Sequence, residues 1–259
     1  MKIYGYLLII FLLVSCNGNR QNQPVANGSE SPTPAAESAN VIRKSMPYVG
    51  DFIMVNNMGT VNVVYTQGPS NIEVEGPEML VNLVKVSVDS GVLIISMSNE
   101  RNKDVQIFQG NRPNVTAYVS SPNLNMVAVC SGGDFVSKGI ITTDKMHIGS
   151  LSNGKIVIDS LECDELKFEV NSVGESTIGC ARISGDCLIL SSGTGKLRVE
   201  DIEVGGKLTL DDINNSTLYC KGKTADLEIN NQGSGLSEFE GTYLTKNVFE
   251  GKDASVIIH

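Results

Sequence analysis

Charged side chains suited to general acid–base chemistry lie between residues 198 and 212. Arg198, Glu200 and Asp201 are almost adjacent, and Asp211 and Asp212 follow them. Glycosidases use paired carboxylates to protonate the leaving oxygen and to activate water or attack the sugar. One hypothesis is therefore a glycan-active enzyme in which these groups converge. The competing interpretation is structural, because Asp is favoured in turns for backbone reasons alone.

The cysteines could supply disulfides or metal ligands. Besides Cys16, the chain contains Cys130, Cys163, Cys180, Cys187 and Cys220. An odd number excludes complete pairing, and the spacing lacks the clustered Cys and His of a metal site. Cys180 and Cys187 are close enough in sequence to meet across a corner. The favoured interpretation is that small thiol side chains fill a narrow core.

The histidine content and the net charge argue against several other kinds of site. Histidine occurs only at positions 147 and 259, and 20 Lys and Arg stand against 29 Asp and Glu, a formal charge of −9. Two histidines leave little basis for a metal site or a general base. An acidic surface repels phosphate. The sequence therefore predicts no metal, no cofactor and no nucleic-acid partner.

The N-terminus reads as an export and anchoring signal. Lys2 precedes an apolar run, Ile3 to Leu13, that is too short to span a bilayer comfortably. The following LVSC resembles the bacterial lipobox, which implies cleavage before Cys16 and acylation of that cysteine. Several acyl chains hold a protein stably on a membrane. The alternative is an ordinary secretion signal with an incidental cysteine, and both predict export.

The next segment should be a tether. Residues 17–40 are rich in Asn, Ser, Gln, Pro and Ala and contain no aromatic residue, so they cannot bury enough apolar surface to fold. The predicted organisation is a signal peptide over 1–15, the lipidated Cys16 with a disordered tether over 16–45, and one folded domain over 46–259. Asn17 is not the aspartate of inner-membrane retention, which by resemblance favours the outer membrane, with the leaflet open.

A repeat governs the remaining chain. Turn residues recur at intervals of 21, 20, 21, 20 and 20: Gly133, Gly154, Gly174, Gly195, Asn215 and Gly235. Asn is the best substitute for Gly where φ is positive, so Asn215 is expected to keep the ladder. Apolar-any-apolar strands begin at 146, 166, 188, 208, 227 and 248. Short strands at this period cannot bury a core singly but can when stacked.

This pattern predicts an all-β parallel solenoid with about 20 residues and about 4.8 Å per coil. A leucine-rich repeat lacks support because its Leu and Asn pattern is missing, and a β-sandwich would have a shorter strand period. If the earlier, irregular strands are counted as coils too, the whole folded body should have roughly ten coils. Residues 46–123 alternate as strands, with one short helix over 77–83, and should form a short N-terminal cap.

Two columns of the predicted surface can be read from the repeat. The residues after the turns alternate in sign: Asp134, Lys155, Glu175 and Lys196. They should stack as a solvated ladder. His147 is expected on an outward face, without a catalytic partner, in a column with Ile189 and Phe249. That partly apolar stripe is either a binding surface or covered by a loop.

The stretches VVYTQGPSNIEVEGPEMLVNLVKVSVDSGVLIISMS, VTAYVSSPNLNMVAVCSGGDFVS and SSGTGKLRV resemble the auto-transporter adhesin head GIN domain family. The resemblance runs from about Val49 to the C-terminus. It implies a secreted or lipid-anchored bacterial protein, of a kind common in Bacteroidetes, with a right-handed parallel β-helix. The chain departs from the pattern at DDINNSTLYC, where the Ser-Gly-x-Gly turn is lost. No residue motif for adhesion can be assigned.

Together these features predict a cell-envelope lipoprotein that binds a glycan or an envelope or host protein without catalysis. Its membrane contact would be the lipid anchor. Two alternatives stay open: the glycan-active β-helix enzyme, and an envelope structural or stress-linked protein without an external ligand. The final SVIIH leaves an apolar strand at one end, so that end could be exposed or could mediate oligomerisation through the C-terminal coil.

Overall fold

The computed structural model describes residues 40–97, 115–151 and 153–259. The predicted signal peptide, Cys16 and most of the tether lie outside these residues. The described part is all-β with one short helix. Its elements are β1 (Val41–Ser45), β2 (Met54–Asn57), β3 (Asn62–Gln67), β4 (Asn71–Pro77), α1 (Glu78–Val81), β5 (Val84–Asp89), β6 (Val92–Met97), β7 (Thr116–Ser121), β8 (Met126–Val129), β9 (Phe135–Lys138), β10 (Ile140–Ser150), β11 (Ile156–Val170), β12 (Glu175–Ile183), β13 (Cys187–Ser191), β14 (Lys196–Asp212), β15 (Thr217–Asn231), β16 (Leu236–Thr242), β17 (Thr245–Glu250) and β18 (Ser255–Ile258).

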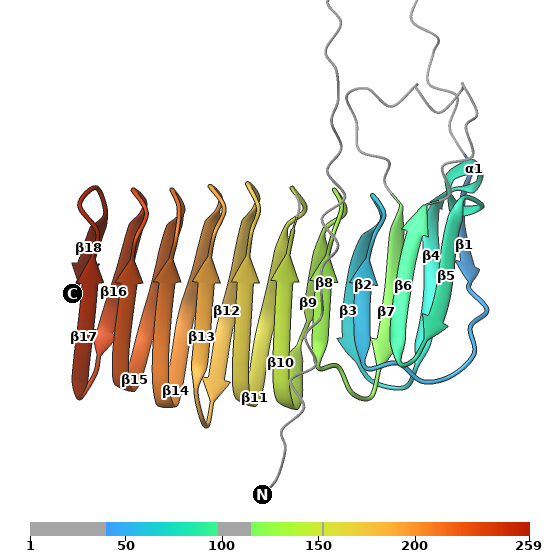
Figure 1. The fold of residues 1–259 in the computed structure, drawn as a ribbon. Coiled ribbons are helices and arrows are strands. Elements are labelled where there is room, and N and C mark those ends of the chain that lie inside the picture. The colour runs from blue at the N-terminus through green and yellow to red at the C-terminus, as the bar shows by residue number, and fades with distance from the viewer. Residues whose placement is uncertain (1–39, 98–114, 152) are drawn as a thin grey trace, which may run out of the picture. The chain divides into compact units, whose positions relative to one another are not determined.

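From β8 onward the chain winds as a solenoid whose coils stack side by side (Figure 1). Face 1 contains β9, the first parts of β11, β12, β14 and β15, then β16 and β18. Face 2 contains the first part of β10, the middle segments 160–163, 180–183, 201–204 and 222–224, and the end of β16. Face 3 contains β8, the last parts of β10, β11, β14 and β15, and β13 and β17.

The parallel register confirms the predicted solenoid and its period. Phe135 pairs with Ile156 and Ile156 pairs with Ser176, which are 21 and 20 residues apart. The solenoid makes about six turns with a spacing of roughly 21 residues. The expectation of ten coils was wrong, because the N-terminal strands do not follow one another as successive coils.

The core is a set of continuous columns of apolar side chains. On face 3 the inward column consists of fully buried, mutually aligned residues: Ile148, Phe168, Ile189, Leu210 and Ile229. Each coil covers the apolar face of the next. Single coils are therefore stabilised by their neighbours rather than by themselves.

The glycine ladder is present for a different reason from the one expected. A Cβ on Gly154 would lie 2.2 Å from the carbonyl oxygen of Gly133, and a Cβ on Gly195 would lie 2.2 Å from that of Gly174. The positive-φ glycines of the described chain are at other positions. Glycine is required here because consecutive coils approach too closely for a side chain.

One member of the predicted ladder was misplaced. The backbone N–H of Thr217 bonds to Gly195, and that of Leu236 bonds to Ser216. The register therefore places Ser216, and not Asn215, between Gly195 and the next coil. The Ser216 hydroxyl is held inside the coil by a 2.7 Å hydrogen bond to Asp212, which is why this rung can carry a side chain.

Gly222 marks the point where the coils become shorter. Val199 pairs with Cys220 but Ile202 pairs with Gly222, so β15 has one residue fewer than β14 at the corner between face 1 and face 2. Gly222 has φ of +150°, and a Cβ there would lie 1.9 Å from the Ile202 carbonyl oxygen. Only glycine fits this corner.

The N-terminal region closes one end of the solenoid. β2 and β3 lie between the β6–β7 and β8–β9 levels, so order along the chain is not order in space. β4 and β5 run antiparallel to β7 and β6. The β5–β6 hairpin turns through Ser90 and Gly91, both with positive φ. With α1 at the predicted helix position, this region forms the expected cap (Figure 1).

β1 extends the folded body five residues before its expected start at Met46. It pairs antiparallel with β4. Arg43 binds Glu73 at 2.6 Å, and its guanidinium lies 4.4 Å from the centre of the Tyr118 ring. The local sequence VIRKS shows little alternation of apolar and polar residues. Pairing with β4, rather than the segment's own sequence, therefore makes these residues a strand.

The last coil presents apolar side chains to solvent. Phe249 on β17 is 56% exposed, whereas Val256 and Ile258 on β18 pack partly against the core. β17 pairs only with β15, and β18 only with β16, within the described residues.

Candidate ligand-binding groove

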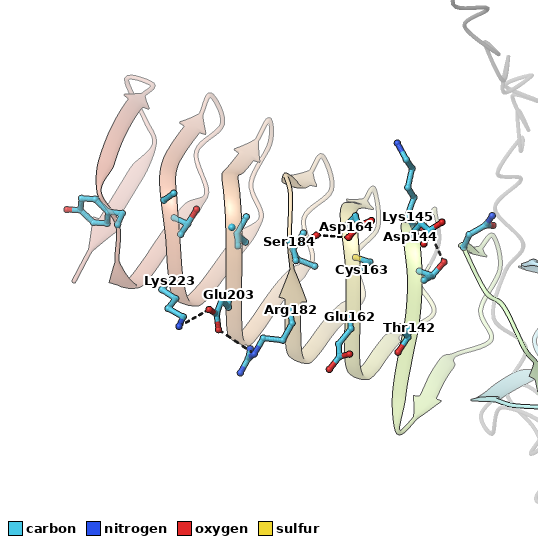
Figure 2. A pocket seen from close by; sticks show the side chains of 18 of the residues that line it. Thr142, Asp144, Lys145, Glu162, Cys163, Asp164, Arg182, Ser184, Glu203 and Lys223 are labelled. Carbon is cyan, nitrogen blue, oxygen red and sulfur yellow. Dashed lines mark hydrogen bonds and ion pairs between the residues drawn. The ribbon is translucent and has the colours of Figure 1, made fainter.

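A long groove follows the corner between face 2 and face 3. It has a volume of about 1350 Å³ and is lined at successive coils from Asn123 to Leu244. Each coil contributes the end of its face 2 segment and the turn that follows. Figure 2 shows these side chains repeated from coil to coil along the solenoid. The groove is therefore a product of stacking, and no single segment of the sequence contains it.

One wall is a row of outward side chains on face 2. Its members are Thr142, Glu162, Arg182, Glu203, Lys223 and Thr242. The central four alternate in sign (Figure 2). Arg182 lies 3.8 Å and Lys223 2.8 Å from Glu203.

A second row occupies the corner itself. Its members are Asp144, Asp164, Ser184, Gly205, Ala225 and Leu244. The first two are acidic, the next three are small, and the last is a leucine that is 85% exposed. The Ser184 hydroxyl donates to Asp164 at 2.5 Å (Figure 2). The corner row thus changes from acidic to apolar along the groove.

The floor consists of nearly buried side chains that point inward from face 2. They are Cys163, Ile183, Val204 and Thr224, each between 3% and 7% exposed. Burial raises the pKa of the Cys163 thiol to about 12, with nearby Asp164 and Glu165 adding to the effect. A thiol with such a pKa is almost wholly protonated at neutral pH and a poor nucleophile. Cys163 is therefore part of the packing.

The charges of the groove do not balance locally. Its three cations are all paired: Lys145 with Glu165, Arg182 with Asp201 and Glu203, and Lys223 with Glu203. Asp201 also raises the pKa of Arg182 through its hydrogen bond. By contrast, within the described part of the chain the Asp144 and Glu162 side chains have no hydrogen bond or ion pair. Asp164 has only Ser184. The uncompensated charge is negative and lies at two adjacent coils.

The five residues considered for acid–base chemistry do not converge. Arg198 and Glu200 pair with each other on face 1, and the Arg198 guanidinium lies 4.0 Å from the Tyr219 ring centre. Asp201 pairs with Arg182 at 2.5 Å near face 2. Asp212 is buried and Asp211 points outward from face 3. The catalytic arrangement that the enzyme hypothesis required from these residues is absent.

The cysteines of the described residues are all free thiols, including Cys180 and Cys187. Cys187 is buried on face 3 whereas Cys180 is partly exposed, so they do not meet. Cys163, Cys187 and Cys220 are buried. The prediction that cysteines fill the core is confirmed for these three.

His147 lies on face 3, beside a smaller hollow of about 750 Å³. Its Nε2 lies 2.6 Å from a carboxylate oxygen of Glu169, which also binds Lys167 at 2.8 Å. The expected column was wrong, because the register aligns Leu188 with Lys167 and leaves Ile189 in the core. The proposed stripe of Ile189 and Phe249 does not exist.

Two further features of the described residues bear on function. Among residues 40–97, 115–151 and 153–259, no three His, Cys, Asp or Glu side chains gather closely enough to hold a metal ion. The described part contains no helix of the length and apolarity needed to cross a membrane.

A family model described as "Putative auto-transporter adhesin, head GIN domain" matches residues 51–205. The chain belongs to this family. A search of curated proteins found no match. Membership in the head GIN domain family supports an adhesin-like role, and a place at the cell surface or in the envelope.

Solved structures share the head GIN domain fold at low sequence identity. A "putative adhesin" from Bacteroides fragilis has a TM-score of 0.71 and 19% identity, over 86% of this chain and 98% of its own. A "putative adhesin" from Parabacteroides distasonis has a TM-score of 0.65 and 17% identity, over 86% of this chain and 98% of its own. A "putative lipid binding protein" from the same species has a TM-score of 0.63 and 16% identity, over 86% of this chain and 98% of its own. At such identities the likeness concerns the fold alone.

Sequence reasoning missed the groove residues, although a signal was available. Glu162, Arg182, Glu203 and Lys223 follow one another at intervals of 20, 21 and 20. The ladder after the turns, Asp134 to Lys196, had the same alternation and drew attention first. Nothing in one coil shows which of these two rows borders a concave corner.

Proposed function

We propose that this protein is a lipoprotein of the cell envelope, anchored through Cys16 in the outer membrane, whose solenoid binds an extended ligand without transforming it. The ligand would be a glycan chain or a protein segment. The lipobox-like LVSC, the tether composition and the adhesin-like family support this proposal.

The observation that carries the proposal is the shape of the groove. It continues over five coil spacings from Asp144 to Leu244, about 24 Å at about 4.8 Å per coil. Its volume of about 1350 Å³ exceeds the usual range of small-molecule pockets, about 300–1,000 Å³. A ligand that fills such a groove must be long and narrow, as a polymer chain is.

A non-catalytic role agrees with the chemistry of the lining. The groove cations are committed to ion pairs, and Cys163 is a protonated, packed thiol. The acids and the arginine of the enzyme hypothesis lie on different faces. Binding with retention of the intact ligand is the function that these features support best.

A blocked groove tests the proposal. Ser184→Trp with Ala225→Trp places two large side chains across its middle, and the full chain in detergent is assayed on glycan and peptide arrays while product release is followed. The matched control is Thr194→Trp with Gln232→Trp, which places the same two large side chains at exposed turns outside the groove. The proposal predicts ligand binding without turnover that only the groove variant loses. Turnover, or equal binding by both variants, would contradict it.

A further inference from the structure

We infer that the groove ligand is an extended polypeptide segment with basic side chains at one end and an apolar side chain at the other. This inference rests on the proposed function and names the class of its ligand. The basic end would lie over Asp144, Glu162 and Asp164, and the apolar end against Tyr243 and Leu244.

The acidic end of the groove selects positive charge. Asp144, Glu162 and Asp164 are all exposed and lie on two neighbouring coils. The nearby cations are already paired: Lys145 is 2.7 Å from Glu165, and Arg182, which is aligned with Glu162, is 2.5 Å from Asp201. Three carboxylates without a cationic partner attract a guanidinium or ammonium group and repel an anionic chain. An acidic glycan is therefore disfavoured at this end.

The other end selects an apolar group. Leu244 is 85% exposed, and Ala225, on the preceding coil, lines the groove beside it. Tyr243 packs toward the core against Phe239, with ring centres 6.3 Å apart. An apolar ligand side chain here would remove Leu244 from water, and the stabilisation grows with the buried area.

The distance between the two ends fits a short extended peptide. Asp164 and Leu244 are separated by four coil steps in the corner row, about 19 Å at about 4.8 Å per step. An extended chain advances about 3.3 Å per residue. The basic and apolar side chains should therefore be about six residues apart.

Lining chemistry favours peptide over neutral glycan. A neutral sugar chain offers no charge to match the three carboxylates. Tyr243 is the only aromatic residue among the described lining residues, and Lys246 lies 5.5 Å from its ring centre. An extended peptide can supply both a cation and an apolar group along one backbone.

The probe is fluorescein-labelled Arg-Arg-Ser-Thr-Gln-Ser-Thr-Leu, and its binding to the full chain in detergent is measured by fluorescence anisotropy. The comparison peptides replace both Arg by Glu, or move Leu to the fourth position. Cellohexaose and an oligogalacturonate are added as competitors. The groove variant is Asp144→Asn with Glu162→Gln and Asp164→Asn.

A charge-matched control separates the groove from general attraction. Asp51→Asn with Glu175→Gln and Asp253→Asn removes the same charge from exposed positions outside the groove. We expect about tenfold weaker peptide binding for the groove variant, and little change for the control, because each exposed pair contributes modestly and three add. The Glu peptide and the moved-Leu peptide should both bind more weakly than the probe.

Each other result overturns the inference in a distinguishable way. Equal weakening by both variants would show general electrostatic attraction. Peptide binding that is unaffected by either variant would place the site elsewhere. Competition by a glycan, abolished by Ser184→Trp with Ala225→Trp, would overturn the peptide class and leave the proposed function standing. Absence of binding to any probe would overturn the inference, and the array experiment would then decide the proposed function.

Discussion

The inner corners of the coils and the outer groove use the same kinds of polar residue in opposite ways. At the end of face 3, Asn57, Asp212 and Asn231 each accept a hydrogen bond from the backbone N–H two residues later. The two asparagines also donate to the carbonyl four residues later, at 2.8 and 3.1 Å. In the groove, Asp144 and Glu162 have no such partners within the described chain.

The difference separates residues that hold the fold from residues that can bind a ligand. An unmet hydrogen bond is costly for a buried polar group, and these three corner side chains bond to the backbone of their own turn. Exposed carboxylates along a concave surface keep their bonding capacity for water or a ligand. Changes at inner corners should therefore alter the free energy of unfolding, whereas changes in the groove should alter binding alone.

The largest effect is expected where an inner corner has no space. Gly222→Ala should lower the free energy of unfolding by more than about 3 kcal/mol, because the new Cβ meets the Ile202 carbonyl and the backbone lies at positive φ. Urea unfolding measures the change. Gly149→Ala is the matched control, since its Cβ would meet nothing nearer than 4.0 Å, and it should stay within about 0.5 kcal/mol. Equal losses of stability in Gly222→Ala and Gly149→Ala would contradict the explanation that the coils approach too closely at Gly222 for a side chain.

A smaller loss of stability is expected at Gln67, whose side-chain amide pairs with the backbone at the edge of face 2. Gln67 donates to the Thr142 carbonyl at 3.0 Å and accepts from its N–H at 2.7 Å, at the edge of face 2. Gln67→Ala should cost about 1–2 kcal/mol because both Thr142 groups lose their partner. Gln67→Glu keeps the acceptor and loses the donor, so its stability in thermal unfolding should lie between that of the original chain and that of Gln67→Ala. A neutral Gln67→Ala would show that water replaces the amide fully.

A gain in stability is expected at Asp212. Burial raises the pKa of this carboxyl, and its Oδ2 has no partner within the described structure. As pH rises above about 3.9, the unfolded chain loses this proton before the folded chain does. The free energy of unfolding therefore falls between that pH and the higher pKa of Asp212 in the folded chain. Asp212→Asn should add about 1 kcal/mol at pH 7, because its amide can donate as those of Asn57 and Asn231 do.

The reverse exchange is the control for this prediction. Asn231→Asp should destabilise the protein by a similar amount and add a new fall in stability between acidic and neutral pH. Urea titrations from pH 3 to 8 compare both variants with the original chain. If Asp212→Asn lowers stability, the parallel between the three corner residues is wrong.

The smallest effect on stability is expected in the groove. Asp144→Asn with Glu162→Gln and Asp164→Asn should change the free energy of unfolding by less than about 0.5 kcal/mol, because these exposed carboxylates have no cationic partner and an amide oxygen at 164 can still accept from Ser184. Differential scanning calorimetry at two salt concentrations measures this. A large loss would mean that these carboxylates stabilise the fold, and the contrast with the inner corners would disappear.

The repeat made the fold readable from the sequence. The period of glycines and strand starts identified stacked coils, and the stretch 46–123, predicted to alternate as strands, contains β3, β4, β5 and β6. The physical cause of the ladder was not readable, because close approach of Gly154 to Gly133 is a contact between coils. The insertion of β2 and β3 between later strands was hidden for the same reason.

The groove was harder to predict than the fold. It is lined by side chains from successive coils, from Asn123 to Leu244, which are far apart in the sequence. A column can be aligned from sequence, but whether it borders a concave or a flat surface is a property of the stacked coils. The Arg198 and Glu200 pair was conspicuous in sequence and lies on another face.

The most direct test of the groove as the ligand site is photo-crosslinking. The peptide Arg-Arg-Ser-Thr-Gln-Ser-Thr-Leu carries benzoylphenylalanine in place of Leu and is irradiated with the full chain, and the attachment sites are mapped by mass spectrometry. We expect attachment at Tyr243, Leu244 or their groove neighbours, and its loss in Ser184→Trp with Ala225→Trp. Attachment on face 1, or on the exposed strands β17 and β18, would contradict it.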